Sequence, residues 1–569
     1  MTTPTQLQQL FSDHWEAWVR WDPLFATQCG DNRYNDRLPV MTDASFQGWR
    51  EQLVSFRKHQ YTIDRSTLSP SDALNYDIFA RLLENEIAEL SYPAYRLPLT
   101  KSGGFHLFFP DLYLLTPFNN ILDYENYISR LKGLNQYFQD SIELMRLGLQ
   151  TGYRPPRVTL DGIPESLQSL LVDDPEHSVF YQPCVNFPAS VDETHRPRLR
   201  NELQAVILAS VVPAYDSLRK FLLDEYLPSA REGISAAELP DGGAFYQHRI
   251  RYFTTLDLTP EAVHQTGLDE VRRIRAEMES IIRATGFAGN FRAFINFLRT
   301  DPRFYAPSPD QLLKETAYVL KRIDGELPRL FKTLPRLPYG IRAIPEFSAP
   351  GNTTAYFQPG AGDGTRAGTY YVNTYDLKSR PLYEIEALSL HEAVPGHHLQ
   401  IAIQQELGEL PNFRRFSGFT AFVEGWALYA ERLGLEMGFY TDPYSDFGRL
   451  SYEMWRACRL VVDTGMHALG WTRQQAIDFM AENTSSTLLN ITNEVDRYIG
   501  WPGQSLAYKI GELKIRELRA HAEEKLGPRF DRREFHDLLL GSGAVSLDVL
   551  ETLVKTWIAK YELPTSLPG

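Results

Sequence analysis

The stretch LHEAVPGHHLQ, residues 390–400, decides how this sequence is interpreted, because it holds three of the chain's 13 histidines and a glutamate. Clustered imidazole and carboxylate groups are typical of a metal site. A single buried histidine on a helix is usually a packing residue, but the clustering reverses that interpretation here. The four residues are His391, Glu392, His397 and His398.

The spacing departs from the pattern His-Glu-x-x-His, in which residues four apart on a helix hold one Zn²⁺ and the glutamate is the general base. Position i+4 from His391 is Pro395. On a regular helix, neither of the following histidines would share a face and a level with His391. Pro395 and Gly396 predict a local bulge that brings His397 into the i+4 role. We predict His397 as the second ligand. His398 is the alternative ligand, or else a group that supports a ligand or lies near the substrate.

The expected third ligand is Glu424, in the amphipathic stretch FVEGWALYAE, residues 422–431. A carboxylate from a second helix would complete a site with three protein ligands and one open position, as catalytic zinc sites have. Glu431, seven residues later on the same face, is the alternative ligand or an acceptor that orients one. We expect one Zn²⁺ per chain. We also expect the site to be catalytic, because a purely structural site would not need Glu392 beside its first ligand.

Two further stretches carry groups that zinc-dependent hydrolysis needs: DTGMHALGW, residues 463–471, and EVDRYIGWPGQSLAYKIG, residues 494–511. An oxyanion is held by groups besides the metal, typically a tyrosine hydroxyl or a histidine N–H, and a substrate carboxylate by an arginine. The stretches offer His467, Tyr508 and Arg497. Each also has a structural interpretation, as a packing residue or, for the arginine, as the partner of a nearby carboxylate.

The composition is that of a globular protein and excludes several functions. The 569 residues carry 58 Lys and Arg and 72 Asp and Glu, a formal net charge of −14 that repels phosphate backbones and anionic membranes. We therefore expect neither nucleic acid nor a membrane as partner. The three scattered cysteines do not suggest a disulfide framework, and the N-terminus lacks the pattern of a secretory signal. These features predict a cytoplasmic protein, and the sequence carries no signal for an oligomeric state.

Helical periodicity dominates the chain and predicts a mainly α-helical fold. The candidate helices are core-facing, since their apolar residues recur every three or four positions. Thr259 followed by Pro260 is a typical helix start. Apolar stripes mark helices at 7–18 and 46–56, and further helices are expected at about 71–90, 121–147, 198–223 and 260–282.

Strand signals are rare. The clearest are residues 354–357 and 368–373, which together predict a small sheet or hairpin. The proline-containing segment 335–345 marks a soft boundary. We expect a mostly helical N-terminal lobe, residues 1–340, and a catalytic lobe, residues 341–569, unless the two form one continuous domain.

The motifs HEAVPGHHLQ, EGWALYAE, DTGMH and RYIGWPGQSLAYKIG together resemble a bacterial family described as a domain of unknown function and grouped with the gluzincin zinc metallopeptidases. The resemblance extends over nearly the whole chain. It implies a large helical, two-lobed body around a deep cleft, with a small β-sheet beside the zinc-binding helix, distantly similar to angiotensin-converting enzyme and thimet oligopeptidase. Those enzymes have a shorter HExGH spacing. Alignment on the shared Gly-His pair supports His397, whereas alignment on the following residues favours His398.

The resemblance also implies roles. His391 and Glu424 would bind zinc, and Glu392 would take a proton from the zinc-activated water and pass it to the leaving amine. His467 and Tyr508 match positions that flank the transition state in such enzymes and would stabilise the oxyanion.

We expect the substrate to be a peptide bond in short or unfolded peptides. The strand at 368–373 could align an extended peptide by main-chain pairing, with Tyr371 in contact with it. His398 and Arg497 are the other expected substrate contacts. Two alternatives are a catalytically inactive peptide-binding protein with a structural metal and a zinc amidase or esterase that acts on a non-peptide substrate.

Overall fold

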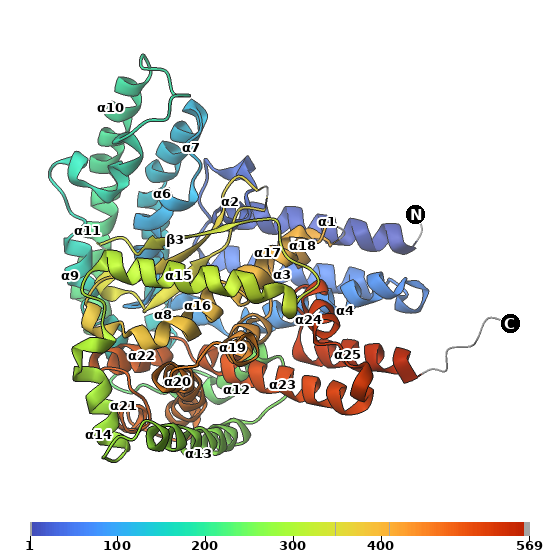
Figure 1. Cartoon of the computed structure of the whole chain (residues 1–569). Coiled ribbons are helices and arrows are strands. Elements are labelled where there is room, and N and C mark those ends of the chain that lie inside the picture. The colour runs from blue at the N-terminus through green and yellow to red at the C-terminus, as the bar shows by residue number, and fades with distance from the viewer. Residues whose placement is uncertain (1–2, 347–348, 363, 409, 563–569) are drawn as a thin grey trace. The chain divides into compact units, whose positions relative to one another are not determined.

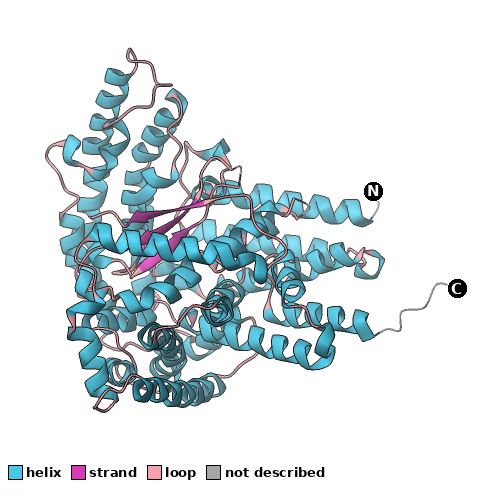
Figure 2. Ribbon diagram, in the orientation of Figure 1, coloured by secondary structure: helices cyan, strands magenta, loops and turns pink. Residues whose placement is uncertain are grey.

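The computed structural model describes residues 3–346, 349–362, 364–408 and 410–562 of the chain. These residues are mainly helical, with a few short strands (Figure 1; Figure 2). The expected fold class is therefore confirmed. Among the helices of the described residues, none combines the length and the apolar character that crossing a bilayer requires.

The chain divides into two compact units, Met1–Gly242 and Gly243–Gly569. We expected the division near residue 340. The division falls earlier because helices between residues 243 and 340 pack with the C-terminal part of the chain. The long helix α13 (Pro260–Ala284) lies along α20 (Pro443–Ala468), and a Cβ on Gly267 of α13 would lie 2.7 Å from the side chain of Val461 on α20.

The first unit is a helical body with its own core, to which α7, α8 and α11 each contribute several buried side chains. A π-helical segment, Ile207–Val211, joins α10 to α11. The helices are α1 (Thr3–Trp21), α2 (Pro23–Cys29), α3 (Asp43–Tyr61), α4 (Pro70–Glu89), α5 (Phe105–Phe108), α6 (Leu112–Leu115), α7 (Ile121–Lys132), α8 (Leu134–Gln150), α9 (Ile163–Gln168), α10 (Arg196–Val206) and α11 (Val212–Phe221), and the strands are β1 (Leu99–Thr100) and β2 (Gly103–Gly104).

The second unit holds all the residues that the sequence singled out for chemistry. Helix α19 packs against α16 and α23. Besides α13 and α20, the helices are α12 (Gly242–Thr254), α14 (Phe291–Thr300), α15 (Pro309–Glu326), α16 (Ile385–Glu392), α17 (His397–Glu406), α18 (Asn412–Phe416), α19 (Thr420–Met437), α21 (Arg473–Asn483), α22 (Leu488–Gly500), α23 (Ala507–Leu526), α24 (Arg532–Gly541) and α25 (Leu547–Glu562).

The expected helices are present, with two differences at their boundaries. The helix expected at 121–147 is two helices, α7 and α8, which meet at Gly133 because glycine is a poor helix former. The helix expected at 198–223 is likewise divided, by the π-helical segment. Helix α13 starts as expected, since the Thr259 side chain accepts a hydrogen bond from the backbone N–H of Ala262.

A three-stranded sheet in the second unit has the strand order β3-β5-β4. Strand β5 (Gly368–Val372) pairs parallel with β3 (Tyr339–Ala343) and antiparallel with β4 (Ala355–Gln358). The expected pair of strands is therefore confirmed, and β3 is an addition. Both edges of β5 are used, so the expectation that this strand offers a free edge to a peptide is wrong.

Candidate metal centre

The chain kinks between the two histidine-bearing helices. Helix α16 ends at Glu392, and α17 begins at His397. The backbone N–H of His398 donates to the carbonyl of Ala393 at 3.0 Å, a span of five residues instead of four, so the kink is a bulge as predicted. A Cβ on Gly396 would lie 1.9 Å from the carbonyl oxygen of His391. Only glycine therefore fits at this point.

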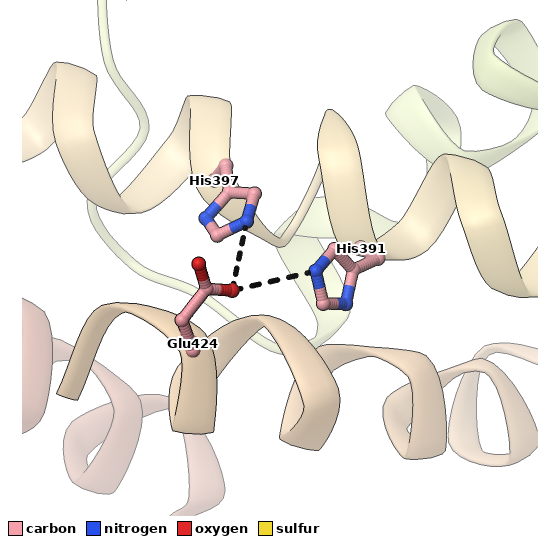
Figure 3. A group of neighbouring side chains, drawn as sticks. All are labelled: His391, His397 and Glu424. Atoms are coloured by element: carbon pink, nitrogen blue, oxygen red, sulfur yellow. Dashed lines mark ion pairs between the residues drawn. The ribbon is translucent and has the colours of Figure 1, made fainter. Parts of the chain in front are cut away.

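The three predicted ligands converge. The Nε2 atoms of His391 and His397 lie 3.7 and 3.4 Å from the same oxygen, Oε2 of Glu424 (Figure 3). One ligand atom from each of the three lies within 4.8 Å of the others. In a tetrahedral zinc site with bonds near 2.0 Å, two ligand atoms are about 3.3 Å apart. The group therefore fits a zinc ion in both donor type and spacing.

Helix α19 brings Glu424 to the histidines. The indole N–H of Trp426, two residues after Glu424, donates to the carbonyl of Pro395 at 2.8 Å, so this helix is fastened to the kink itself. Oε2 of Glu424 is buried and has no hydrogen-bond partner among the described residues. A buried carboxylate oxygen without a donor is costly, and a cation would remove that cost.

Glu431 orients the first ligand. Nδ1–H of His391 donates to Oε1 of Glu431 at 2.8 Å, which leaves Nε2 free for a metal. Glu431 is 2% exposed, and Arg456 lies 3.5 Å from the same carboxylate. Zinc-binding histidines commonly donate their other N–H to a carboxylate in this way. The structure thus favours Glu431 as an orienting acceptor and not as the third ligand.

The charges of the group are strongly coupled. Burial opposes the protonation of His391, but the nearby carboxylates of Glu424 and Glu431 outweigh burial and raise the pKa of His391 to about 9. Burial likewise opposes the ionisation of Glu424, yet His397 and His391 hold the pKa of its carboxyl well below the usual range. The site is therefore built for a carboxylate and for positive charge beside it.

His398 points away from the group, into the sheet. Its ring centroid lies 4.7 Å from that of Tyr339 on β3 and 5.6 Å from that of Phe357 on β4. Burial lowers its pKa to about 4, although a hydrogen bond to the backbone of Leu337 acts the other way. His398 is 3% exposed and packs against the sheet, so the structure does not bring it into the group with His391 and Glu424.

The expected general base, Glu392, is the last residue of α16 and is buried, with 8% exposure. The neighbouring side chain on the sheet is Tyr370 of β5, whose pKa is raised by burial and by the Glu392 charge. Tyr371 lies on the opposite face of β5, where its ring stacks on Tyr356 at 4.8 Å. The strand therefore turns Tyr370, and not the expected Tyr371, toward α16.

Tyr508 lies beside the metal group. Its ring is nearly parallel to that of His391, at 15° and 6.4 Å between centroids. The guanidinium of Arg459 covers it at 4.5 Å from the ring centroid. Gln504, one turn earlier, donates to the Tyr508 hydroxyl oxygen at 3.4 Å. Tyr508 is therefore a neighbour of the first expected ligand.

The other two downstream candidates make internal contacts. His467 is fully buried, with Nε2 3.0 Å from the carbonyl oxygen of Tyr498 and its ring 5.2 Å from that of Tyr246. It therefore packs in the interior and is not brought into the three-residue group. Arg497 pairs with Glu494 at 2.9 Å, in agreement with its structural interpretation.

Sequence reasoning missed Asp463, the first residue of the DTGMH motif. Its carboxylate is fully buried and accepts hydrogen bonds from the backbone N–H of Gly503 at 3.1 Å, the Ser505 hydroxyl at 2.8 Å and the Tyr246 hydroxyl at 2.7 Å. It fastens the turn that precedes Tyr508. Asp463 lies in one of the motifs and its partners Gly503 and Ser505 lie in another, which was the only hint of a contact. The sequence alone does not pair them, because Asp463 and Gly503 are 40 residues apart.

Three comparisons bear on the chain. The model of a family described as "Bacterial protein of unknown function (DUF885)" matches residues 23–554. A crystal structure titled as a "putative lipoprotein" from Colwellia psychrerythraea superposes with a TM-score of 0.93 at 29% identity, over 98% of this chain and 100% of the other. A "putative lipoprotein of unknown function" from Shewanella oneidensis has a TM-score of 0.73 at 17% identity, over the same shares, and supports the fold alone. No curated protein matches.

Proposed function

We propose a function from the site itself, since the chain belongs to the bacterial DUF885 family of proteins of unknown function. The proposal is a zinc-dependent hydrolase that cleaves peptide bonds in short or unfolded peptides. The metal would be held by His391, His397 and Glu424, with Glu431 as the acceptor that orients the first histidine.

One observation carries the proposal: two imidazoles and a carboxylate converge from three helices, α16, α17 and α19, and a glutamate follows directly on the first of them. Structural zinc sites usually have four protein ligands, often cysteines. Among the side chains in the described ranges, this group has three members and no cysteine. A site with three ligands leaves a position for water, which favours catalysis over a purely structural role.

The chain's own residues supply the remaining steps. When bound, the ion would act as a Lewis acid that polarises a carbonyl and acidifies water. Glu392 would accept the proton of the attacking water and deliver it to the departing amine nitrogen. The Tyr508 hydroxyl would donate a hydrogen bond to the carbonyl oxygen as it gains negative charge.

The peptide substrate is supported by the resemblance of the motifs to zinc metallopeptidases. If a peptide pairs with the described sheet, it would pair with β3 or β4, which are its edge strands, and not with β5. Strand β4 also carries Phe357, which packs on His398 of the ligand-bearing helix α17.

The test is metal analysis coupled to a cleavage assay. The purified chain should contain about one zinc, cleave members of a peptide library, lose this activity with a chelator and regain it with added zinc. A chain that takes up no zinc contradicts the metal site. A zinc-loaded chain that cleaves esters or simple amides but no peptide contradicts the substrate class, and one that binds peptides without cleaving them indicates a binding protein.

A further inference from the structure

The hydroxyl of Tyr508 has a side-chain partner, and which of the two groups donates the hydrogen bond can be deduced. Nε2 of Gln504 lies 3.4 Å from the Tyr508 hydroxyl oxygen. The contact is long, as catalytic hydrogen bonds often are before a substrate binds. An amide NH₂ can only donate. The tyrosine oxygen must therefore accept, and its own proton points in another direction.

The orientation of this amide is set by Arg497. Nη1 of Arg497 lies 3.0 Å from Oε1 of Gln504. A guanidinium has donors and no acceptor, so the oxygen of the amide must face it. The NH₂ end of Gln504 then faces Tyr508. Without Arg497 the amide could turn over and accept the Tyr508 proton instead, since both orientations occupy the same space.

Arg497 is itself held in place. Its Nε and Nη2 donate to the two oxygens of Glu494 at 3.3 and 2.9 Å. Nη2 of Arg459 donates to the same carboxylate at 3.2 Å, and Nε of Arg459 donates to the Tyr498 hydroxyl at 2.8 Å. Glu494 is 7% exposed and Gln504 is 6% exposed. This network is preorganised, because water has little access to compete with it.

The backbone of Gln504 is fixed independently. Asp463 binds the residues on both sides of it, through the N–H of Gly503 and the hydroxyl of Ser505. Gly503 adopts a φ of 79°, which is favourable for glycine. The side chain of Gln504 therefore leaves a rigid turn, and its amide is the part whose orientation needs a partner.

We propose that Gln504, oriented by Arg497, is a positioning residue that keeps the Tyr508 hydroxyl proton available to the substrate. The inference rests on the proposed function, in which Tyr508 donates to the developing oxyanion. It also assigns Arg497 a different role from the carboxylate binding expected from the sequence. In Gln504→Glu, a carboxylate would accept the Tyr508 proton and withdraw it from the substrate.

The test is a double-mutant cycle on the zinc-loaded full chain, with kcat and KM measured for a peptide that the wild type cleaves. Gln504→Glu should lower kcat about 10-fold or more and change KM less than about twofold, since one oxyanion donor contributes about 10²–10³ in kcat. In a Tyr508→Phe background the same change should have no further effect. Gln504→Met, which cannot hydrogen-bond, should give a smaller loss, and the exposed Gln52→Glu should behave as wild type.

Zinc content and the unfolding temperature report whether a variant is intact. An equal loss of kcat from Gln504→Glu in both backgrounds, a rise in KM with kcat unchanged, or wild-type activity would overturn the inference.

If the wild type cleaves no peptide, the proposed function fails. The effect of Arg497 on Tyr508 through Gln504 can then be measured from the ¹⁹F resonance of 3-fluorotyrosine at position 508. Arg497→Lys should shift this resonance in the wild type but not in Gln504→Met. Equal shifts in both would contradict the inference.

Discussion

Gly425 and Gly511 bring α19 and α23 into backbone contact. A Cβ on Gly425 would lie 2.5 Å from the Cα of Gly511, and a Cβ on Gly511 would lie 1.9 Å from the carbonyl oxygen of Ala421. Gly425 directly follows Glu424, and Gly511 lies three residues after Tyr508. The contact of the two glycines therefore sets the distance between the expected metal ligand and the expected oxyanion donor.

Gly511→Ala should separate these helices. The methyl group has no space, and over-packing of this kind typically costs about 1–3 kcal/mol of unfolding free energy. We expect a lower midpoint in denaturant and a kcat that falls more than the zinc content does. Gly325→Ala on α15 is the control, because a Cβ there meets nothing within 4 Å. Unchanged stability and turnover in Gly511→Ala would show that the helices adjust freely.

His397→Ala and His398→Ala should differ in zinc binding. Loss of His397 removes a ligand, and we expect zinc affinity to fall by more than the roughly 10–100-fold that follows loss of a supporting residue. His398→Ala should keep about one zinc per chain and lower the unfolding temperature, since this side chain packs on the sheet. Zinc analysis after dialysis and a melting curve measure both. The opposite pattern would make His398 the ligand.

Glu392→Gln should retain the metal and lose hydrolysis. The amide is nearly the same size but cannot accept a proton, and a general base contributes about 10²–10⁴ to the rate. Stoichiometric zinc with a 10²-fold or greater loss of kcat is the expected result. Activity close to that of the wild type would require another base.

Glu431→Gln should weaken zinc binding without abolishing it. The amide still accepts from His391, but without the negative charge, and changes of this kind typically cost about 10–100-fold in metal affinity. Competition with a zinc chelator measures the affinity. Glu436→Gln on the same helix is the control, since Glu436 pairs with Arg519 and Arg532. Equal effects of the two substitutions would argue against an orienting role.

His14 should make the first unit sensitive to acid. It is 1% exposed among aromatic rings, and burial lowers its pKa to about 4, below the usual 6.5. Between these values the unfolded chain binds a proton that the folded chain does not, so stability falls as pH drops from 6.5 to 4. The slope is at most about 1.4 kcal/mol per pH unit. His14→Leu should reduce this slope in denaturant titrations from pH 7 to 4.5, and an unchanged slope would contradict the assignment.

The residues of the candidate centre were accessible from the sequence because their signal is local. The Pro395 and Gly396 pair predicted a bulge, and the structure has one there. Glu424 and Glu431 share a helix face by their spacing alone. The helical fold class followed in the same way from periodicity.

The other features of the fold and of the site depend on contacts between residues far apart in the sequence, which the spacing of residues within a motif does not predict. The position of His467 is set by its contact with the Tyr498 backbone, 31 residues away. The central place of β5 depends on β3, a strand that carried no clear signal. The division of the chain at Gly242 depends on α13 lying along α20, which is a matter of tertiary packing.

Helix α20 contacts both the candidate metal site and the turn before Tyr508, although it carries none of the expected ligands. Through Arg456 it reaches the carboxylate that orients His391, and through Asp463 it holds the turn that leads to Tyr508. A substitution that tilts this helix would therefore displace the candidate metal site and Tyr508 together. Variants that alter only the candidate metal site or only the region of Tyr508 should therefore lie on the turns and on α16 and α19, while α20 should tolerate little change over the two turns that separate Arg456 from Asp463.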